Sequence, residues 1–289
     1  SLQIHLELNS ASAVRFYNAA HILSAPMVAL SANSPFLFGH ELWEESRVPL
    51  FEQAVAVPAF YDGEGHLIER VTFGTRYVSD SLIEVFRENQ DRFPVLLPLL
   101  FNEGGNTLDH LRLHNGTIWR WNRPLVDFDD QGRPTLRLEH RVAPAGPSLP
   151  DSMANILFFY GLIHYLAGLG DAPEHRLHFE HAAANFYRAA RRGLSATVFW
   201  LDGREYELRE LLLDQLVPAT AQTLERLGIA EADIRTYLHG IIVPRIRGGQ
   251  TGAAWQRQFI AHHGRDFNAM TDAYYHNQTQ HNPVHQWKI

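Results

Sequence analysis

Residues 135–142 read TLRLEHRV, and their pattern indicates the fold class. The side chains alternate between two faces with a period of two, as they do in a β-strand. One face is mainly apolar, whereas the other carries three charges, at Arg137, Glu139 and Arg141. Neighbouring side chains on one face of a strand lie about 6.5–7 Å apart, so the three charges form a continuous row.

Two interpretations of this charged row are open from the strand alone. Many antiparallel strands have one solvated face, and an Arg-Glu-Arg row there can be an ordinary ladder of surface ion pairs. The row can also be a binding site. A carboxylate would then hold a metal ion between guanidinium groups that grip phosphate or carboxylate.

A second strand pattern at residues 2–9, LQIHLELN, has the same two-faced character. Its polar face carries Gln3, His5, Glu7 and Asn9. If both strands lie in one sheet, their apolar faces pack on helices and their polar faces form one floor. Such a floor suits a nucleotide with magnesium, because Mg²⁺ prefers carboxylate and phosphate oxygens and arginine grips phosphate with two donors. We therefore expect His5 on the same side of the sheet as Glu139 and Arg141.

The composition excludes several other classes of protein. The 289 residues are 45% hydrophobic and 20% charged, and the net charge is -7. No block of five basic residues occurs, so nucleic acid is not expected as a partner. The longest apolar stretches are interrupted by Asn and His, so no membrane span is expected. The chain has no cysteine, which rules out disulfides, thiolate metal sites and a cysteine nucleophile. No signal peptide is recognisable, so we expect a cytoplasmic protein.

The order of the patterns predicts an α+β fold, an antiparallel sheet with flanking helices. We expect one domain over residues 1–289, with 1–150 mainly sheet and loops and 151–289 mainly helical. The aromatic stretch GTIWRWN and the opening strand should form a hairpin closed by the turn DDQGRP. Residues 33–51 are expected to be a loop, since they contain Pro35 and Gly39.

Two helix boundaries can also be predicted. Ser10 or Ser12 is a suitable cap for a helix that Pro26 should kink or divide. Asp151 is the predicted cap of a long apolar helix that follows APAGPSLP.

Several motifs, taken in order, resemble one known family. They are LQIHLEL, ALSANSPFLFG with Arg47 after it, NGTIWRWNRP, RLEHRV, NFYRAARRGL and GQTGAAWQ. The E-x-R of Glu139-His140-Arg141, preceded by Arg123-Pro124, is the most specific of them. The sequence resembles the carboxylate–amine ligase and glutamate–cysteine ligase family, of the bacterial and plant type related to glutamine synthetase.

The resemblance implies a glutamine-synthetase-like catalytic domain and an ATP-dependent ligase. In this family ATP phosphorylates a carboxylate, usually the γ-carboxylate of glutamate, and an amine then attacks the acyl phosphate to give an amide. By resemblance Glu139 is a magnesium ligand, and Arg141 contacts the transferred phosphate or the acceptor carboxylate. Arg123 is the second catalytic candidate. The positions that correspond to substrate-binding or site-supporting residues are Gln3, His5, Arg47 and Arg191.

The sequence departs from the family pattern at one point. Relatives carry an early strand with paired glutamates that bind magnesium, and no E-x-E lies near the start of this chain, which begins directly in a strand pattern. We therefore expect the chain to be the C-terminal part of a larger ligase whose other half completes the metal site. The alternative is a catalytically incomplete, ligase-like binding or interaction module. The identity of the amino acid and amine substrates, and whether the chain forms a homo-oligomer, remain open.

Overall fold

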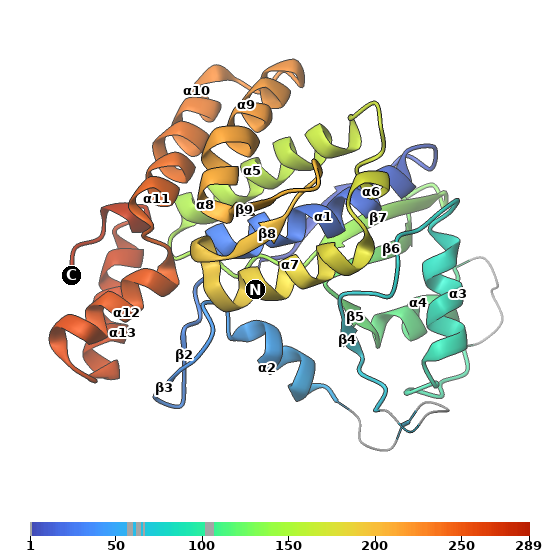
Figure 1. Ribbon diagram of the computed structural model, residues 1–289. Helices are drawn as coiled ribbons and strands as arrows, with labels where there is room; N and C mark the ends of the chain where they lie inside the picture. The colour runs from blue at the N-terminus through green and yellow to red at the C-terminus, as the bar shows by residue number, and fades with distance from the viewer. Residues whose placement is uncertain (1, 57–59, 62–64, 66, 102–106) are drawn as a thin grey trace.

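The computed structural model describes residues 2–56, 60–61, 65, 67–101 and 107–289 (Figure 1). Helices make up most of the molecule, and the strands form small sheets. In chain order the strands are β1 (Ile4–Glu7), β2 (Phe36–Leu37), β3 (His40–Glu41), β4 (Val71–Thr72), β5 (Trp119–Arg120), β6 (Asn122–Phe128), β7 (Pro134–His140), β8 (Thr197–Phe199) and β9 (Glu205–Glu207).

In the described ranges four helices end before residue 149, where α5 begins, and the part after it is mainly helical. The α-helices are α1 (Ala13–Ser31), α2 (Arg47–Ala54), α3 (Ile83–Arg92), α4 (Asp109–Gly116), α5 (Leu149–Ala167), α6 (Pro173–Arg176), α7 (Phe179–Arg192), α8 (Leu208–Leu211), α9 (Val217–Arg226), α10 (Glu231–Asp233), α11 (Val243–Gly248), α12 (Gly252–His263) and α13 (Phe267–Thr279). Two π-helical segments, η2 (Leu212–Leu216) and η3 (Ile234–Ile242), join α8 to α9 and α10 to α11, and η1 (Gly193–Ser195) and η4 (Val284–Gln286) are short 3₁₀ turns. None of the helices in the described ranges is long and apolar enough to cross a membrane.

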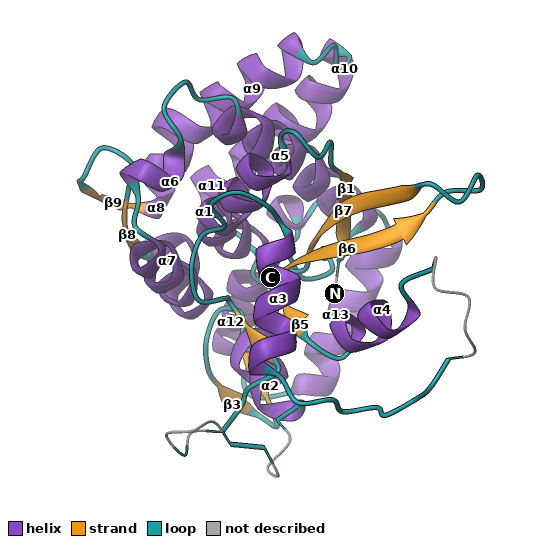
Figure 2. Ribbon diagram, turned by 90° about the vertical axis from the view of Figure 1, so that its right-hand side faces the viewer, coloured by secondary structure: helices purple, strands orange, loops and turns teal. Residues whose placement is uncertain are grey.

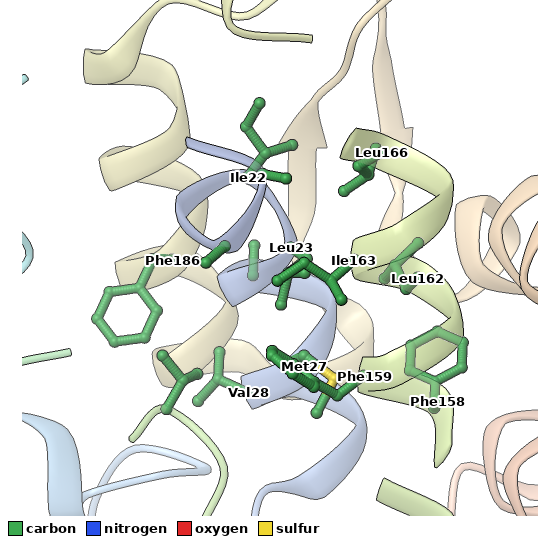
Figure 3. Close-up of a cluster of buried hydrophobic side chains, with 14 of the residues drawn as sticks. Ile22, Leu23, Met27, Val28, Phe158, Phe159, Leu162, Ile163, Leu166 and Phe186 are labelled. Atoms are coloured by element: carbon green, nitrogen blue, oxygen red, sulfur yellow. The ribbon is translucent and has the colours of Figure 1, made fainter. Parts of the chain in front are cut away.

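Helix α1 is the centre of the core and packs between α5 and α7 (Figure 3). Its side chains are small or apolar on nearly every side, which is the pattern of a helix that is buried all round. Pro26 does not divide the helix, because α1 runs without interruption to Ser31. The side chain of Pro26 is itself buried, so packing on both flanks holds the helix together despite the missing backbone donor.

The main sheet has the order β1-β7-β6, and both pairings are antiparallel (Figure 2). Its apolar face packs on α1 and α5. Asn122 donates hydrogen bonds to the Ala20 carbonyl and to Ser24 Oγ of α1, and the His140 ring lies 4.7 Å from the Phe159 ring of α5. The alternation predicted for residues 2–9 and 135–142 is thus confirmed, and the opposite face is left for polar side chains.

Several predicted boundaries need correction. Residues 33–51 are not a loop, since they contain the β2–β3 hairpin and most of α2, and Phe36 packs 5.2 Å from the ring of Phe267 in α13. The first arm of the large hairpin is β6, whereas β5 before it pairs in parallel with β4. The cap of α5 is Ser148, and Asp151 is the third residue of a capping box. The β4–β5 pairing and the contact of Phe36 with Phe267 depend on residues far away in the sequence, whereas the capping box is local.

Asp151 also forms a fully buried ion pair with Arg245 of α11, at 2.7 Å. Arg245 donates a second hydrogen bond to Asn155, and the backbone N–H of Val284 donates to Asp151 at 3.0 Å. One carboxylate therefore joins the start of α5 to α11 and to the C-terminal tail.

Two buried histidines lie where the sheet meets α1. The nitrogens of His21 lie 3.1 and 3.0 Å from the carbonyl oxygens of Tyr17 and Phe73, and His140 Nδ1 lies 2.7 Å from Asn122 Oδ1. Burial lowers the pKa of His21 to about 4 and that of His140 to about 3. Both rings are therefore neutral in the folded protein at pH 7.

We expect acid to destabilise the fold through these histidines. At pH values between the folded pKa values and the unfolded value of 6.5, both imidazoles are protonated in the unfolded chain and neutral in the folded protein. The contribution of the two histidines to stability is therefore present above pH 6.5 and is lost as the pH falls. The free energy of unfolding should fall by about 1 kcal/mol per histidine between pH 7 and pH 5.5. Urea unfolding over this range measures the loss. His140→Gln should flatten the pH dependence, and His175→Gln, at an exposed side chain, should not. Equal slopes for the two variants would contradict the assignment.

Candidate functional site

The polar face of the main sheet is arranged in rows that cross its three strands. In one row His5 of β1, Glu139 of β7 and Arg123 of β6 lie opposite one another in the hydrogen-bonding register. In the next row Arg141 follows β7 and lies beside Trp121, and its backbone N–H donates to the Trp121 carbonyl at 2.9 Å. The two rows form a floor that three segments of the chain build together.

Glu139 lies at the centre of this floor and is only 3% exposed. Its Oε2 accepts hydrogen bonds from Arg123 Nε at 2.8 Å and from Arg141 Nη1 at 3.2 Å. Its Oε1 lies 3.6 Å from His5 Nε2. The prediction that His5, Glu139 and Arg141 share one side of the sheet is therefore confirmed.

The floor carries more positive charge than negative charge. Two guanidinium groups share one carboxylate, and burial lowers the pKa of Arg123 although Glu139 raises it. Arg123 Nη1 is buried without a hydrogen-bond partner in the described ranges. An anion that reached the floor would supply the missing acceptor and balance the charge, and planar guanidinium groups bind phosphate and carboxylate through two donors.

The charged row of β7 divides into two parts that differ in burial and in partners. Arg137 is paired with Asp127 at 2.8 Å, and both side chains are more than one-third exposed. This pair is an ordinary surface contact of small energetic value. Glu139 and Arg141 are instead largely buried and are packed against other charges. The site interpretation therefore concerns only the C-terminal end of the strand.

Arg47 lies at the start of α2 and supports the strand end from the side. Its Nε contacts the buried carboxylate of Glu45 at 3.0 Å, and its guanidinium donates to the backbone carbonyls of Arg141 and Val142. The guanidinium also lies 5.2 Å from the centre of the Trp121 ring. These contacts fit a residue that positions Arg141, and its predicted role as a substrate ligand stays a prediction.

Gln3 and Arg191 are not part of the ion-paired cluster. Gln3 is exposed and precedes β1. Arg191 is exposed at the end of α7, where its backbone carbonyl accepts a hydrogen bond from Glu44. Their proposed contacts with substrate remain predictions.

The donor set offers limited ligation to a magnesium ion. In the parts of the chain that the structure describes, there is no group of three or more His, Asp or Glu side chains that could hold a metal. Glu139 Oε2 is engaged by arginines, so its Oε1 is the oxygen that could serve as a ligand. A magnesium ion here would depend on phosphate oxygens, water or ligands from outside the described residues for the rest of its shell.

Sequence reasoning missed an aromatic wall beside the floor. Phe51 of α2 lies 5.6 Å from the Arg141 guanidinium and 6.0 Å from the Trp121 ring. Glu52 accepts hydrogen bonds from Trp121 Nε1 at 3.0 Å and from the hydroxyl of Tyr187, in α7, at 2.8 Å. The signal for Trp121 was present in WRWNR, because Trp121 and Arg123 are two residues apart and so share a face.

The chain is similar to one known family and to one solved structure. The model of a family described as glutamate-cysteine ligase family 2 matches residues 1–284. No curated protein sequence matches the chain. Among solved structures, the glutamate–cysteine ligase of Francisella tularensis in complex with AMP is similar over 94% of this chain, with a TM-score of 0.53 and 12% sequence identity. The chain spans 58% of the length of that ligase, and at this identity the likeness concerns the fold.

Proposed function

The chain belongs to glutamate-cysteine ligase family 2, and from this premise we propose that it forms the catalytic floor of an ATP-dependent carboxylate–amine ligase. ATP would phosphorylate the γ-carboxylate of glutamate or of a similar acid, and an amine would displace the phosphate to give an amide. The domain would accordingly be of the glutamine-synthetase-like type. The observation that carries the proposal is the buried cluster of Glu139 with Arg123 and Arg141.

The chemistry of phosphoryl transfer suits such a floor. The reaction needs positioning and charge neutralisation more than covalent help from the protein. Arg141, with donors left over from its contact with Glu139, would bind the transferred phosphoryl group or the acceptor carboxylate. Arg123 would hold Glu139 in place and offer its free Nη1 to the same anion. Magnesium, when bound, would neutralise phosphate charge, with Glu139 Oε1 as its ligand from this chain.

We further propose that a polypeptide segment outside these 289 residues completes the site. The free edge of β1 supports this, because β1 pairs only with β7 in the described part of the chain. Its other edge offers unpaired backbone groups beside His5, where a further strand could bind. The fold neighbour is longer than this chain, which is consistent with the same arrangement.

The 289 residues alone should therefore bind ATP–Mg²⁺ weakly or not at all. The described residues supply too few oxygen ligands for metal ions that bridge the phosphates. Isothermal titration calorimetry with ATP and excess MgCl₂ measures this directly, and ATP without magnesium is the control. Micromolar or tighter binding that requires magnesium would show that the chain carries a sufficient metal site by itself.

Turnover is the test of the proposed function. The protein, with any flanking sequence encoded beside it, is assayed for conversion of ATP to ADP in the presence of amino acids and amines, beginning with glutamate and cysteine. The ligase proposal requires ADP formation that depends on both an acid and an amine. If no pair stimulates turnover, the chain is better described as a ligase-like binding module.

A further inference from the structure

Glu52 is a half-buried carboxylate at the edge of the floor. Only its Oε1 is engaged, since both Trp121 Nε1 and the Tyr187 hydroxyl donate to this oxygen. Its Oε2 accepts no hydrogen bond from any residue that the structure describes, and Glu52 has no ion-pair partner in the same ranges. The carboxylate is thus fixed in direction by two donors while one oxygen remains available.

Contacts with the floor place Glu52 close to Arg141. The preceding residue, Phe51, packs against the Arg141 guanidinium, and the indole that binds Glu52 belongs to the residue paired with Arg141 across the sheet. Phe51 and Trp121 therefore link Glu52 to Arg141. A substrate atom bound by Arg141 and a group bound by Glu52 could belong to two reactants that meet beside these two rings.

Two other carboxylates of this region, Glu139 and Glu45, are already neutralised. Glu139 is shared by two arginines, and Glu45 accepts from Arg47, Ser34 and the backbone of Asn33. Glu52 differs from both, because its donors are an indole and a phenol, which leave its negative charge unbalanced.

The surroundings of Glu52 suit a side chain that accepts a proton. Burial raises its pKa, the two hydrogen bonds lower it, and the negative charge of Glu69 raises it. Arg47, on the same helix, forms its ion pair with Glu45 and lies 5.2 Å from the centre of the Trp121 ring. A carboxylate with a raised pKa is the better general base near neutral pH.

We propose, on the basis of the proposed function, that Glu52 binds the ammonium group of the amine substrate and takes one proton from it. The free amine then attacks the carbonyl carbon of the acyl phosphate. A C–N bond forms, the C–O bond to the phosphate breaks, and the second proton of the nitrogen leaves with the phosphate. Glu52 afterwards returns its proton to solvent, so atoms and charges balance over the cycle.

Glu52→Gln tests this assignment, because the amide keeps an oxygen that can accept from Trp121 and Tyr187 but cannot take a proton. Amide formation from ATP, glutamate and cysteine should fall about 10²-fold, the usual contribution of a positioned base. Hydroxylamine is mostly uncharged at pH 7, so it needs no base, and hydroxamate formation by the variant should equal that of the wild type. The matched control is Glu225→Gln, which alters an exposed carboxylate on α9 and should leave both products unchanged.

Each outcome separates the two proposals. Loss of amide with retention of hydroxamate supports Glu52 as the base. Equal loss of both products, or no loss of either, overturns the assignment while the ligase proposal stands. Absence of ADP, amide and hydroxamate with the wild-type protein overturns the proposed function and, with it, the role of Glu52. Far-UV circular dichroism and urea unfolding of Glu52→Gln show whether a loss of both products comes from misfolding.

Discussion

Arg141→Lys should lower the rate of amide formation about 10²–10³-fold, equivalent to roughly 3–4 kcal/mol of transition-state stabilisation. The arginine is held by Glu139, by the ring of Phe51 and by its backbone contact with Trp121. Lysine keeps the positive charge but loses the planar pair of donors, so it cannot bind Glu139 and an oxyanion with the same geometry. The measurement is kcat for ADP formation with glutamate and cysteine.

Arg137→Lys is the matched control on the same strand face. Its partner is the exposed carboxylate of Asp127, and a surface pair of this kind contributes about 0–1 kcal/mol, so the rate should change less than about fivefold. If the two lysine variants are equally active, Arg141 has no special role and the whole row on β7 is a surface ladder.

Arg245→Met should lower the free energy of unfolding by about 3–5 kcal/mol, because the replacement leaves the carboxylate of Asp151 buried without its cation. Asp151 is fully buried at the point where α5, α11 and the tail at Val284 meet. We expect this loss in urea denaturation at pH 7. The change should be accompanied by weaker protection of the tail in hydrogen exchange.

Two further variants show whether the buried charge of Asp151 causes the loss of stability in Arg245→Met. Arg235→Met removes an exposed partner of Glu231, four residues away where α10 continues into η3, and should cost about 0.3–0.5 kcal/mol. Asp151→Asn in the Arg245→Met background removes the unpaired charge and should restore part of the stability. If the double variant is no more stable than Arg245→Met, lost packing explains the effect and the buried charge does not.

The two strand patterns predicted the sheet faces correctly because each strand is short and has one buried side. Leu138 and Ile4 are buried, whereas Glu139 and His5 lie together on the opposite face, as period-two alternation requires. Sequence alone could not separate the surface pair of Arg137 from the buried pair of Arg141, since burial depends on which helix covers each end of the strand.

The parts that could not be predicted depend on contacts between distant residues. Glu52 comes directly after residues 33–51, which were expected to be a loop, and its partners, Trp121 and Tyr187, are 69 and 135 residues away in the chain. Pro26 argued for a break in α1 that burial on both flanks prevents. The remaining ligands of a metal ion could not be predicted either, because we propose that they come from outside this sequence.

In the proposed reaction, the floor around Glu139 and Arg141 transfers a phosphoryl group to a carboxylate. The most direct test uses glutamate whose γ-carboxylate carries a heavy-oxygen label, with ATP, magnesium and cysteine, and mass spectrometry of the phosphate released by the protein with its flanking sequence. An acyl phosphate passes one labelled oxygen from the carboxylate to the phosphate, so we predict one label in each phosphate formed. Phosphate released without label would contradict phosphoryl transfer to the carboxylate.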